Sequence, residues 1–231
     1  MEFLGDPVVA HGVVERRVDI PCEDRVVPAV VWTPADASGA RPLVLIGHGG
    51  TGHKRMDYVL ALARRLTRHR GFAVAAIDGP GHGDRKGAVD RKTWMSKPVI
   101  ESMNADWKAT RAALADLPEV GDGPLGYWGL SMGTMFGVPF VASEPSVRVA
   151  VLGLGGAIGQ RYTASAADIR CPVLFLQQLD DELVPRASAL ELFLAIGSAD
   201  KRLHAHPGPH IAVPPEEFEQ SEAFLAQHLE A

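Results

Sequence analysis

The sequence is poor in cysteine. Its 231 residues include two, Cys22 and Cys171, and these do not form the C-x-x-C spacing of a redox motif. Two cysteines cannot build the disulfide framework of a small secreted domain, so a reducing compartment is indicated. We therefore predict a cytoplasmic protein in which both thiols fill space and take no part in chemistry.

A surplus of positive charge and long apolar runs are also missing. Lysine and arginine number 23 against 28 aspartate and glutamate residues, a net charge of −5, which gives no basic surface for nucleic acid. No apolar run reaches the length of a membrane span, and the opening residues, MEFLGDPVVAHGVVERR, lack the pattern of a signal peptide. The sequence thus predicts neither a nucleic-acid partner nor insertion into a membrane.

No internal repeat and no long linker divides the chain. With 231 residues, 46% of them hydrophobic, the chain is within the size at which one core stays undivided. We predict a single domain over 1–231, with a short insertion at about 85–103 that covers the functional site.

Short apolar runs alternate with segments of helical spacing. The runs typical of buried parallel strands cover residues 43–48, 72–79, 124–131, 147–155 and 172–178. Helical spacing covers residues 56–70, about 101–117, 132–143, 187–196 and 215–228. Residues 13–22 and 25–34 suit an antiparallel hairpin at the sheet edge. This alternation predicts an α/β fold: a mostly parallel, doubly wound sheet with helices on both faces.

The strand over 124–131 ends in Gly129-Leu130-Ser131-Met132-Gly133 and runs directly into a helical segment. G-x-S-x-G between a strand and a helix is the pattern of a nucleophile elbow, in which small flanking residues allow a sharp turn. The pattern alone is weak evidence in a glycine-rich chain, and its position between strand and helix strengthens it. Ser131 is the predicted nucleophile.

A serine hydroxyl needs a histidine to take its proton and a carboxylate to hold that histidine. The acidic pair Asp180 and Asp181 follows the predicted strand over 172–178, and His210 follows Pro-Gly-Pro before the last helix. The chain order Ser, Asp, His fits the α/β-hydrolase arrangement.

G-L-S-M-G, D-x-x-V-P after a strand, and P-G-x-H before a closing helix together resemble the α/β-hydrolase superfamily. The resemblance covers nearly the whole chain and is nearest to the compact branch of dienelactone-hydrolase-like proteins and prolyl-oligopeptidase-like esterases. It implies that Asp181, four residues before Pro185, is the acid and Asp180 a solvated neighbour. Gln178 departs from the glycine usual in relatives. Dienelactone hydrolases proper use a cysteine nucleophile, so their lactone substrate does not transfer.

The stretch LVLIGHGGTGHKR, residues 43–55, has two interpretations. Gly47, Gly52 and Lys54 approach a phosphate loop, but His53 takes the lysine position and Arg55 replaces the hydroxyl residue. Glycines at a strand end also aim backbone N–H groups at a developing oxyanion. Local sequence leaves both open.

The family resemblance favours the oxyanion interpretation. It implies that the backbone N–H groups of Gly50 and Met132 form the oxyanion hole, with Thr51 as the alternative to Gly50. It also leaves Asp78, in a glycine-rich turn, as an alternative acid, although the D-x-x-V-P match favours Asp181. His48 is expected to brace the loop.

His204, His206 and His210 have the spacing H-x-H-x-x-x-H, which zinc ligands on a strand can share. Metal binding is an alternative, but packing or solvent exposure is the favoured explanation of His204 and His206, and we predict no metal and no cofactor.

The segment over 85–103 is the insertion long enough to cover Ser131. Trp94, Met95, Ile100 and Met103 are candidates for an acyl or alcohol pocket, although such side chains also anchor loops. The segment over 153–170 is too short for a lipase lid, which predicts an open site.

These observations predict a serine hydrolase of small to medium carboxylic esters with a small-molecule substrate. Thioesterase, lactonase and amidase or peptidase activities use the same triad and remain alternatives. A non-catalytic receptor on the same fold is the alternative of another class. The sequence does not indicate an oligomeric state.

Overall fold

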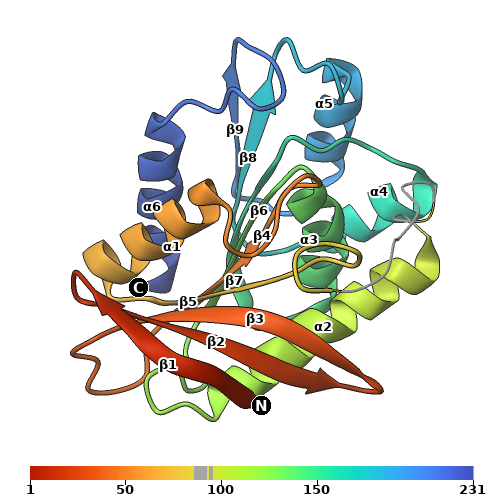
Figure 1. Ribbon diagram of the computed structural model, residues 1–231. Coiled ribbons are helices and arrows are strands. Elements are labelled where there is room, and N and C mark those ends of the chain that lie inside the picture. The colour runs from red at the N-terminus through yellow and green to blue at the C-terminus, as the bar shows by residue number, and fades with distance from the viewer. Residues whose placement is uncertain (86–92, 94–95, 231) are drawn as a thin grey trace. The chain divides into compact units, whose positions relative to one another are not determined.

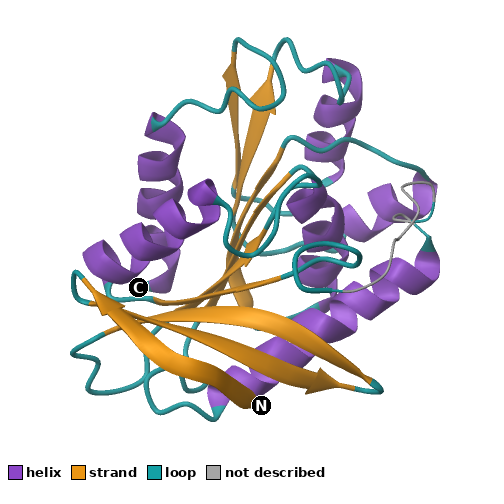
Figure 2. Ribbon diagram, viewed as in Figure 1, coloured by secondary structure: helices purple, strands orange, loops and turns teal. Residues whose placement is uncertain are grey.

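The computed structural model describes residues 1–85, 93 and 96–230. The chain forms two compact units, Met1–Leu125 and Gly126–Ala231. From Leu43 onward, strands and helices alternate along the described residues, as the sequence predicts for the α/β class (Figure 1, Figure 2).

The described residues of the first unit form strands in the order β1-β2-β3-β5-β4. Their bounds are β1 (Glu2–Ala10), β2 (Val13–Cys22), β3 (Arg25–Pro34), β4 (Leu43–Gly47) and β5 (Ala73–Ile77). The strands β1, β2 and β3 pair antiparallel, β3 pairs antiparallel with β5, and β4 pairs parallel with β5.

The predicted hairpin forms as β2 and β3, but its expected place at the sheet edge was wrong. The edge strand is β1, which pairs with β2 and shifts register between Leu4 and Val8. The sequence analysis missed β1 because the strand is exposed along most of its length and contains Gly5 and Pro7, so it shows no apolar alternation.

Two helices, α1 (Asp57–Arg70) and α2 (Lys97–Ala115), accompany these strands. The helix α1 ends at Gly71, whose φ of 66° is the left-handed conformation that suits a helix end. The helix α2 begins at Lys97 rather than near residue 101, because Ser96 and a proline in the first turn start it earlier.

The second unit contains β6 (Leu125–Leu130), β7 (Val147–Gly153), β8 (Val173–Gln178) and β9 (Lys201–His206), neighbours in that order. Its helices are α3 (Met132–Ser143), α4 (Gln160–Ala166), α5 (Arg186–Ala195) and α6 (Glu216–Leu229). Figure 1 shows α6 on one side of the strands and α3, α4 and α5 on the other. The short α4 was not predicted, since a helix of seven residues, about two turns, shows little periodicity.

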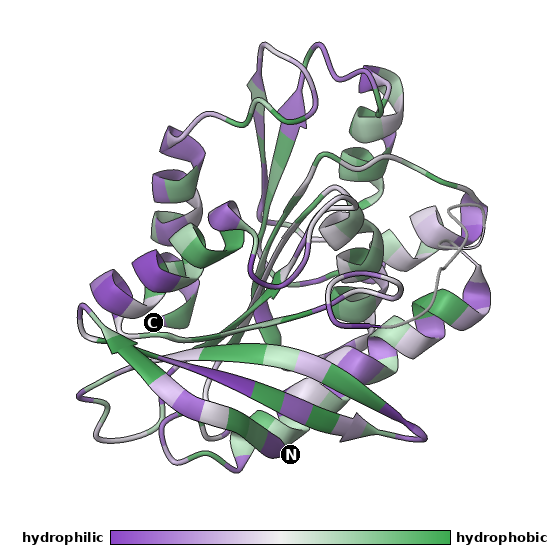
Figure 3. Cartoon of the chain, in the orientation of Figure 1, coloured by the Kyte–Doolittle hydropathy of each residue, from purple (hydrophilic) through white to green (hydrophobic). Residues whose placement is uncertain are grey.

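Buried apolar strands form the core of this unit. Every residue of β6 and β8 is buried, whereas β9 at the sheet edge is partly exposed. Figure 3 colours the strands by residue hydropathy, from purple for hydrophilic to green for hydrophobic. The strands β7, β8 and β9 run parallel, so the loops that follow them leave from one edge of the sheet. The Ser131 N–H donates to Gly153 O at the end of β7 over 2.9 Å, which places the end of β6 at that edge too.

Candidate active site

Ser131 stands at the sharp turn between β6 and α3. Its backbone has φ 58° and ψ −118°, a strained conformation for a residue with a side chain. A Cβ at Gly129 would lie 2.8 Å from the carbonyl of Gly133, so this position admits no larger residue without a shift. The turn lifts the Ser131 hydroxyl to the edge of the sheet, as the sequence pattern predicts for a nucleophile elbow.

Thr134 braces the turn from inside, a role that the sequence analysis did not identify. Its fully buried hydroxyl lies 2.8 Å from Gly129 O and 2.6 Å from Gly153 O, and it accepts the Gly153 N–H over 2.7 Å. One hydroxyl thus joins the ends of β6 and β7 below Ser131. The chain itself gives no signal for this contact, because Gly153 is distant in sequence.

The structure brings His210 and Asp181 to Ser131. His210 Nε2 lies 2.9 Å from Ser131 Oγ, and His210 Nδ1 lies 2.7 Å from Asp181 Oδ2. The side chains of His210 and Asp181 are 7% and 3% exposed. In the tautomer that fits both contacts, Nδ1–H donates to the carboxylate and Nε2 accepts the serine proton. This arrangement can deprotonate a serine hydroxyl during attack.

The second oxygen of Asp181 is also engaged. Oδ1 accepts the N–H groups of Leu183 and Val184, each over 2.8 Å, so the loop after β8 fixes the carboxylate orientation. These hydrogen bonds and the contact with His210 hold both oxygens of Asp181 in place.

Asp180 is exposed to solvent, as the family resemblance implied, with 59% of its side chain accessible, and it also contacts a neighbouring loop. Its Oδ2 accepts the Gly208 N–H over 2.9 Å and its Oδ1 pairs with Arg186 over 2.9 Å. The Asp180 N–H in turn donates to Gly208 O over 3.1 Å. Asp180 therefore anchors the loop that carries His210, while Asp181 contacts the imidazole.

Glu182 and Gln178 add further anchors that the sequence analysis missed. Glu182 Oε2 accepts the backbone N–H of His210 over 3.0 Å, and Gln178 Nε2 donates to Ala212 O. The His210 N–H lowers the pKa of Glu182 below its usual value. Gln178, where relatives usually have glycine, thus connects the end of β8 to the loop after His210. In the sequence, the acidic run from Asp180 to Glu182 was the feature that could have indicated such a contact.

The predicted oxyanion donors lie in both units. Met132 is the first residue of α3, where a helix leaves its N–H groups without partners in the helix. Gly50 and Thr51 follow β4 in the first unit, and His82 Nε2 lies 2.9 Å from Gly50 O. Among the described residues, the Gly50 and Thr51 N–H groups have no hydrogen-bond acceptor. Their shared role with Met132 stays a prediction.

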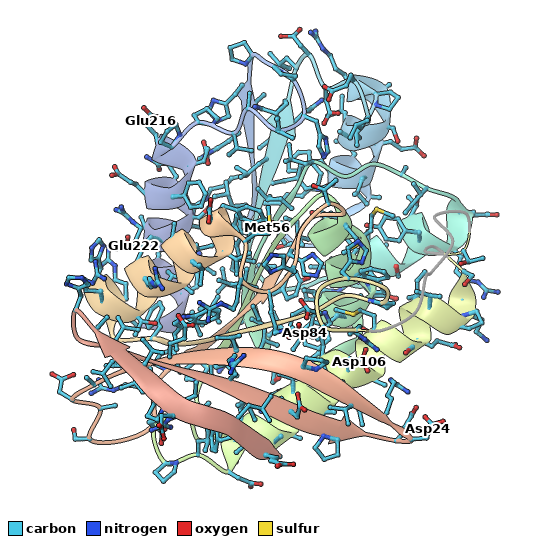
Figure 4. All side chains as sticks on the ribbon, viewed as in Figure 1. Asp24, Met56, Asp84, Asp106, Glu216 and Glu222 are labelled. Carbon is cyan, nitrogen blue, oxygen red and sulfur yellow. The ribbon has the colours of Figure 1, made fainter. Side chains whose placement is uncertain are left out.

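Lys54 and Asp78 form a buried ion pair in the first unit. Lys54 Nζ lies 2.5 Å from Asp78 Oδ2 and 2.6 Å from Asp84 Oδ2, and the Lys54 N–H donates to Asp78 Oδ1 over 2.9 Å. Asp84 is labelled in Figure 4. The carboxylates of Asp78 and Asp84 both pair with the Lys54 ammonium group, the group that would bind phosphate in a phosphate loop. Asp78, an alternative acid in the sequence analysis, is committed to Lys54.

His48 joins the loop after β4 to the loop after β5. Its Nδ1 lies 2.8 Å from Gly49 O, and its Nε2 accepts the Gly79 N–H over 2.8 Å. Burial lowers the pKa of His48 to about 4, so the ring is neutral at pH 7. The bracing role expected of His48 matches these contacts.

The candidate pocket residues divide into two pairs. Trp94 and Met95 lie outside the described residues. Ile100 and Met103 lie in α2, where Ile100 is partly exposed and Met103 is 3% exposed. The pocket role of all four remains a prediction.

The three histidines of H-x-H-x-x-x-H do not gather at one point. His210 contacts Ser131, while Glu217 from α6 lies with His204 and His206. Glu217 Oε1 is 3.0 Å from His204 Nδ1 and 2.6 Å from His206 Nε2.

Neither cysteine is a candidate nucleophile. Burial raises the pKa of the Cys22 thiol, and raises that of Cys171 to about 12. Both thiols are therefore protonated at neutral pH, and the thiolate needed for attack is scarce.

Known proteins share this arrangement of elements. The sequence profile described as the dienelactone hydrolase family matches residues 27–212. The chain belongs to this family. It is therefore a hydrolase that acts on esters, in the α/β-hydrolase fold that the sequence predicted.

A cold-adapted esterase from an Arctic intertidal metagenomic library, solved with bound PEG, is 40% identical, with a TM-score of 0.90 over 99% of this chain and 100% of the other. "Esterase YjfP" of Escherichia coli strain K12 is 25% identical over 81% of this chain and 89% of its own length. An esterase of Pyrococcus furiosus shares the fold at 18% identity, with a TM-score of 0.73 over 93% of both chains.

None of the helices in the described part of the chain combines the length and the apolar character that a membrane crossing demands.

Proposed function

We propose that the chain is a serine esterase in which Ser131 is the nucleophile, His210 the general base and acid, and Asp181 the residue that orients His210. The observation that carries the proposal is the pair of contacts made by one imidazole, 2.9 Å to Ser131 Oγ and 2.7 Å to Asp181 Oδ2. These contacts supply the three roles that acyl transfer to serine requires.

In the first step Ser131 Oγ attacks the ester carbonyl carbon and its proton passes to His210 Nε2. The tetrahedral oxyanion is stabilised by the Met132 N–H and by the N–H of Gly50, or of Thr51 in its place. Loss of one such donor typically lowers turnover by about 10²–10³-fold. The imidazolium then protonates the alkoxy leaving group as the C–O bond breaks, which leaves an acyl group on Ser131.

In the second step a water molecule gives a proton to His210 Nε2 and attacks the acyl carbonyl. Collapse of this second intermediate returns the proton to Ser131 Oγ and releases the carboxylic acid. Asp181 stays ionised throughout and stabilises the imidazolium.

The substrates we propose are small-molecule esters with small to medium acyl groups. Between β7 and β8, the short α4 is the longest helical segment that the chain forms. A lid that would enclose a long acyl chain is therefore not supplied by this segment. Ile100 and Met103 of α2, with Trp94 and Met95, are the proposed specificity residues.

A chromogenic ester series of rising acyl length tests the reaction and its specificity together. Wild-type protein is expected to be fastest on the shorter acyl groups, and Ser131→Ala to lose several orders of magnitude in kcat/KM. Matched thioester, lactone and amide substrates separate the three rival hydrolase activities. No turnover by the wild type on any of them would contradict the proposal and favour a non-catalytic receptor.

The cytoplasmic location is part of the same proposal and is supported by the two unpaired cysteines, Cys22 and Cys171.

A further inference from the structure

A second polar cluster lies in the same unit as Ser131 and takes no part in the proposed reaction. It consists of His204 and His206 on β9 and Glu217 in the first turn of α6. Side chains two residues apart on a strand share a face, so the two imidazoles reach α6 together. The three candidate ligand atoms lie within 4.8 Å of one another.

The contacts of the cluster converge on one oxygen. Glu217 Oε1 is 3.0 Å from His204 Nδ1 and 2.6 Å from His206 Nε2, and Glu217 Oε2 is 3.2 Å from His204 Nδ1. Ligand atoms around a tetrahedral zinc ion are separated by about 3.3 Å when each bond is about 2.0–2.1 Å long. After small side-chain movements, an ion can therefore take the place of the hydrogen-bonding protons between Glu217 and the two imidazoles.

The charge balance of the cluster also suits a cation. The Glu217 side chain is 4% exposed, and no lysine or arginine pairs with it among residues 1–85, 93 and 96–230. A buried carboxylate is costly without a positive partner. His204 and His206 are 32% and 29% exposed, so an ion and a water ligand can reach the ring nitrogens.

We propose that His204, His206 and Glu217 form a binding site for a divalent transition metal, with zinc the best match to two imidazole nitrogens and one carboxylate oxygen. The sequence analysis favoured packing or solvent exposure for the two histidines and did not identify Glu217 as their partner. His206 ends β9 and Glu217 is in the first turn of α6, so the ion joins the two ends of the segment 207–215. That segment carries His210.

Zinc binding to chelator-treated, dialysed protein, followed by isothermal titration calorimetry, tests the site. The wild type is expected to bind one zinc ion per chain at this cluster. His204→Gln, His206→Gln and Glu217→Gln are each expected to weaken binding by at least about 100-fold. Glu216→Gln is the matched control, since Glu216 is exposed in the same turn of α6 (Figure 4), and it should bind as the wild type does.

The variant His210→Ala separates this site from the triad. It is expected to retain zinc binding, and loss of binding there would place the ion at Ser131 and overturn the proposal. So would a wild type that binds no zinc, or ligand variants that bind as tightly as the wild type. Circular dichroism of each variant establishes that it is folded, and the partly exposed His204 gives a substitution that disturbs the core least.

Thermal unfolding adds a readout that does not depend on hydrolysis. Zinc is expected to raise the Tm of the wild type and of Glu216→Gln, because an ion bound only by the folded chain stabilises it. It should leave the Tm of His206→Gln unchanged. An equal rise in all three would contradict the site, whether or not the chain cleaves esters.

Discussion

The carboxylate of Glu182 holds the backbone of His210: Oε2 accepts the His210 N–H over 3.0 Å. The contact is distinct from the imidazole contacts with Asp181 and Ser131, and it fixes the main chain from which the imidazole extends. A residue that acts in this way positions the base and does not take part in proton transfer.

Removal of the Glu182 carboxylate should therefore reduce turnover without changing the chemistry. We expect Glu182→Ala to lower kcat roughly tenfold with little change in KM, since a small misplacement of a catalytic group is costly. Glu182→Gln keeps an oxygen acceptor and should recover most of the rate. Steady-state kinetics on one short-chain ester measures both, and equal rates for all three proteins would remove the positioning role.

The acid dependence of this contact has a definite sign. The His210 N–H lowers the pKa of Glu182, so the carboxylate stabilises the folded loop above the ordinary pKa of a glutamate and loses this effect as pH falls through the lowered value. The Glu182→Gln variant has no proton to gain there. Its stability should therefore fall less than that of the wild type on acidification below pH about 4, as measured by urea unfolding.

Asp180 and Asp181 should differ sharply on substitution. Asp181→Asn places an amide beside His210 Nδ1 and favours the wrong tautomer, so we expect kcat to fall about 10³–10⁴-fold. Asp180→Asn removes charge from a contact with Gly208 N and Arg186 and is expected to cost less than about tenfold. A larger loss for Asp180→Asn than for Asp181→Asn would show that Asp180, and not Asp181, is the residue that orients His210.

Thr134 offers a test of the elbow that is separate from catalysis. Thr134→Val keeps the shape but leaves the buried Gly153 N–H and the carbonyls of Gly129 and Gly153 without the hydroxyl. The expected loss in free energy of unfolding is about 1–3 kcal/mol. Thr163→Val, at a partly exposed residue of α4, is the control and should change stability by less than about 0.5 kcal/mol. Chemical denaturation measures both.

His48 predicts how the stability of the fold responds to mild acid. Burial lowers its pKa from 6.5 to about 4, so between these values the unfolded chain binds a proton that the folded ring refuses. Stability then decreases as pH falls, by roughly 2 kcal/mol between pH 7 and pH 5 from this residue alone. His48→Gln should reduce the loss, whereas His69→Gln, on the exposed surface of α1, should leave it unchanged.

Urea unfolding at the two pH values measures this difference. A His48→Gln variant with the same pH dependence as the wild type would assign the acid sensitivity to other groups.

The sequence predicted the elements whose residues repeat a local pattern. The strands β4, β5 and β6 and the first four residues of β8 are apolar, and the elbow around Ser131 has a fixed local spacing, so neither depends on distant residues. The order Ser, Asp, His was readable because each residue follows a strand end. The strand β1 was not predicted, because its pairing with β2, and not burial, makes it a strand.

The contacts that support the site could not be predicted in the same way. Thr134 reaches Gly153, Glu182 reaches His210, and Glu217 reaches two histidines on β9, all across gaps that only the fold closes. Asp180 is exposed as expected, but its contact with Gly208 was not predicted, because Gly208 belongs to a different loop. Residue type and spacing locate the reacting groups, while the groups that hold them depend on tertiary structure.

The most direct measurement of the central claim is fluorophosphonate labelling followed by mass spectrometry of the modified peptide. The account predicts one covalent adduct on Ser131, none on Ser131→Ala, and strongly slowed labelling of His210→Ala, because the hydroxyl loses its base. An adduct on another residue, or equal labelling of Ser131→Ala and the wild type, would contradict it.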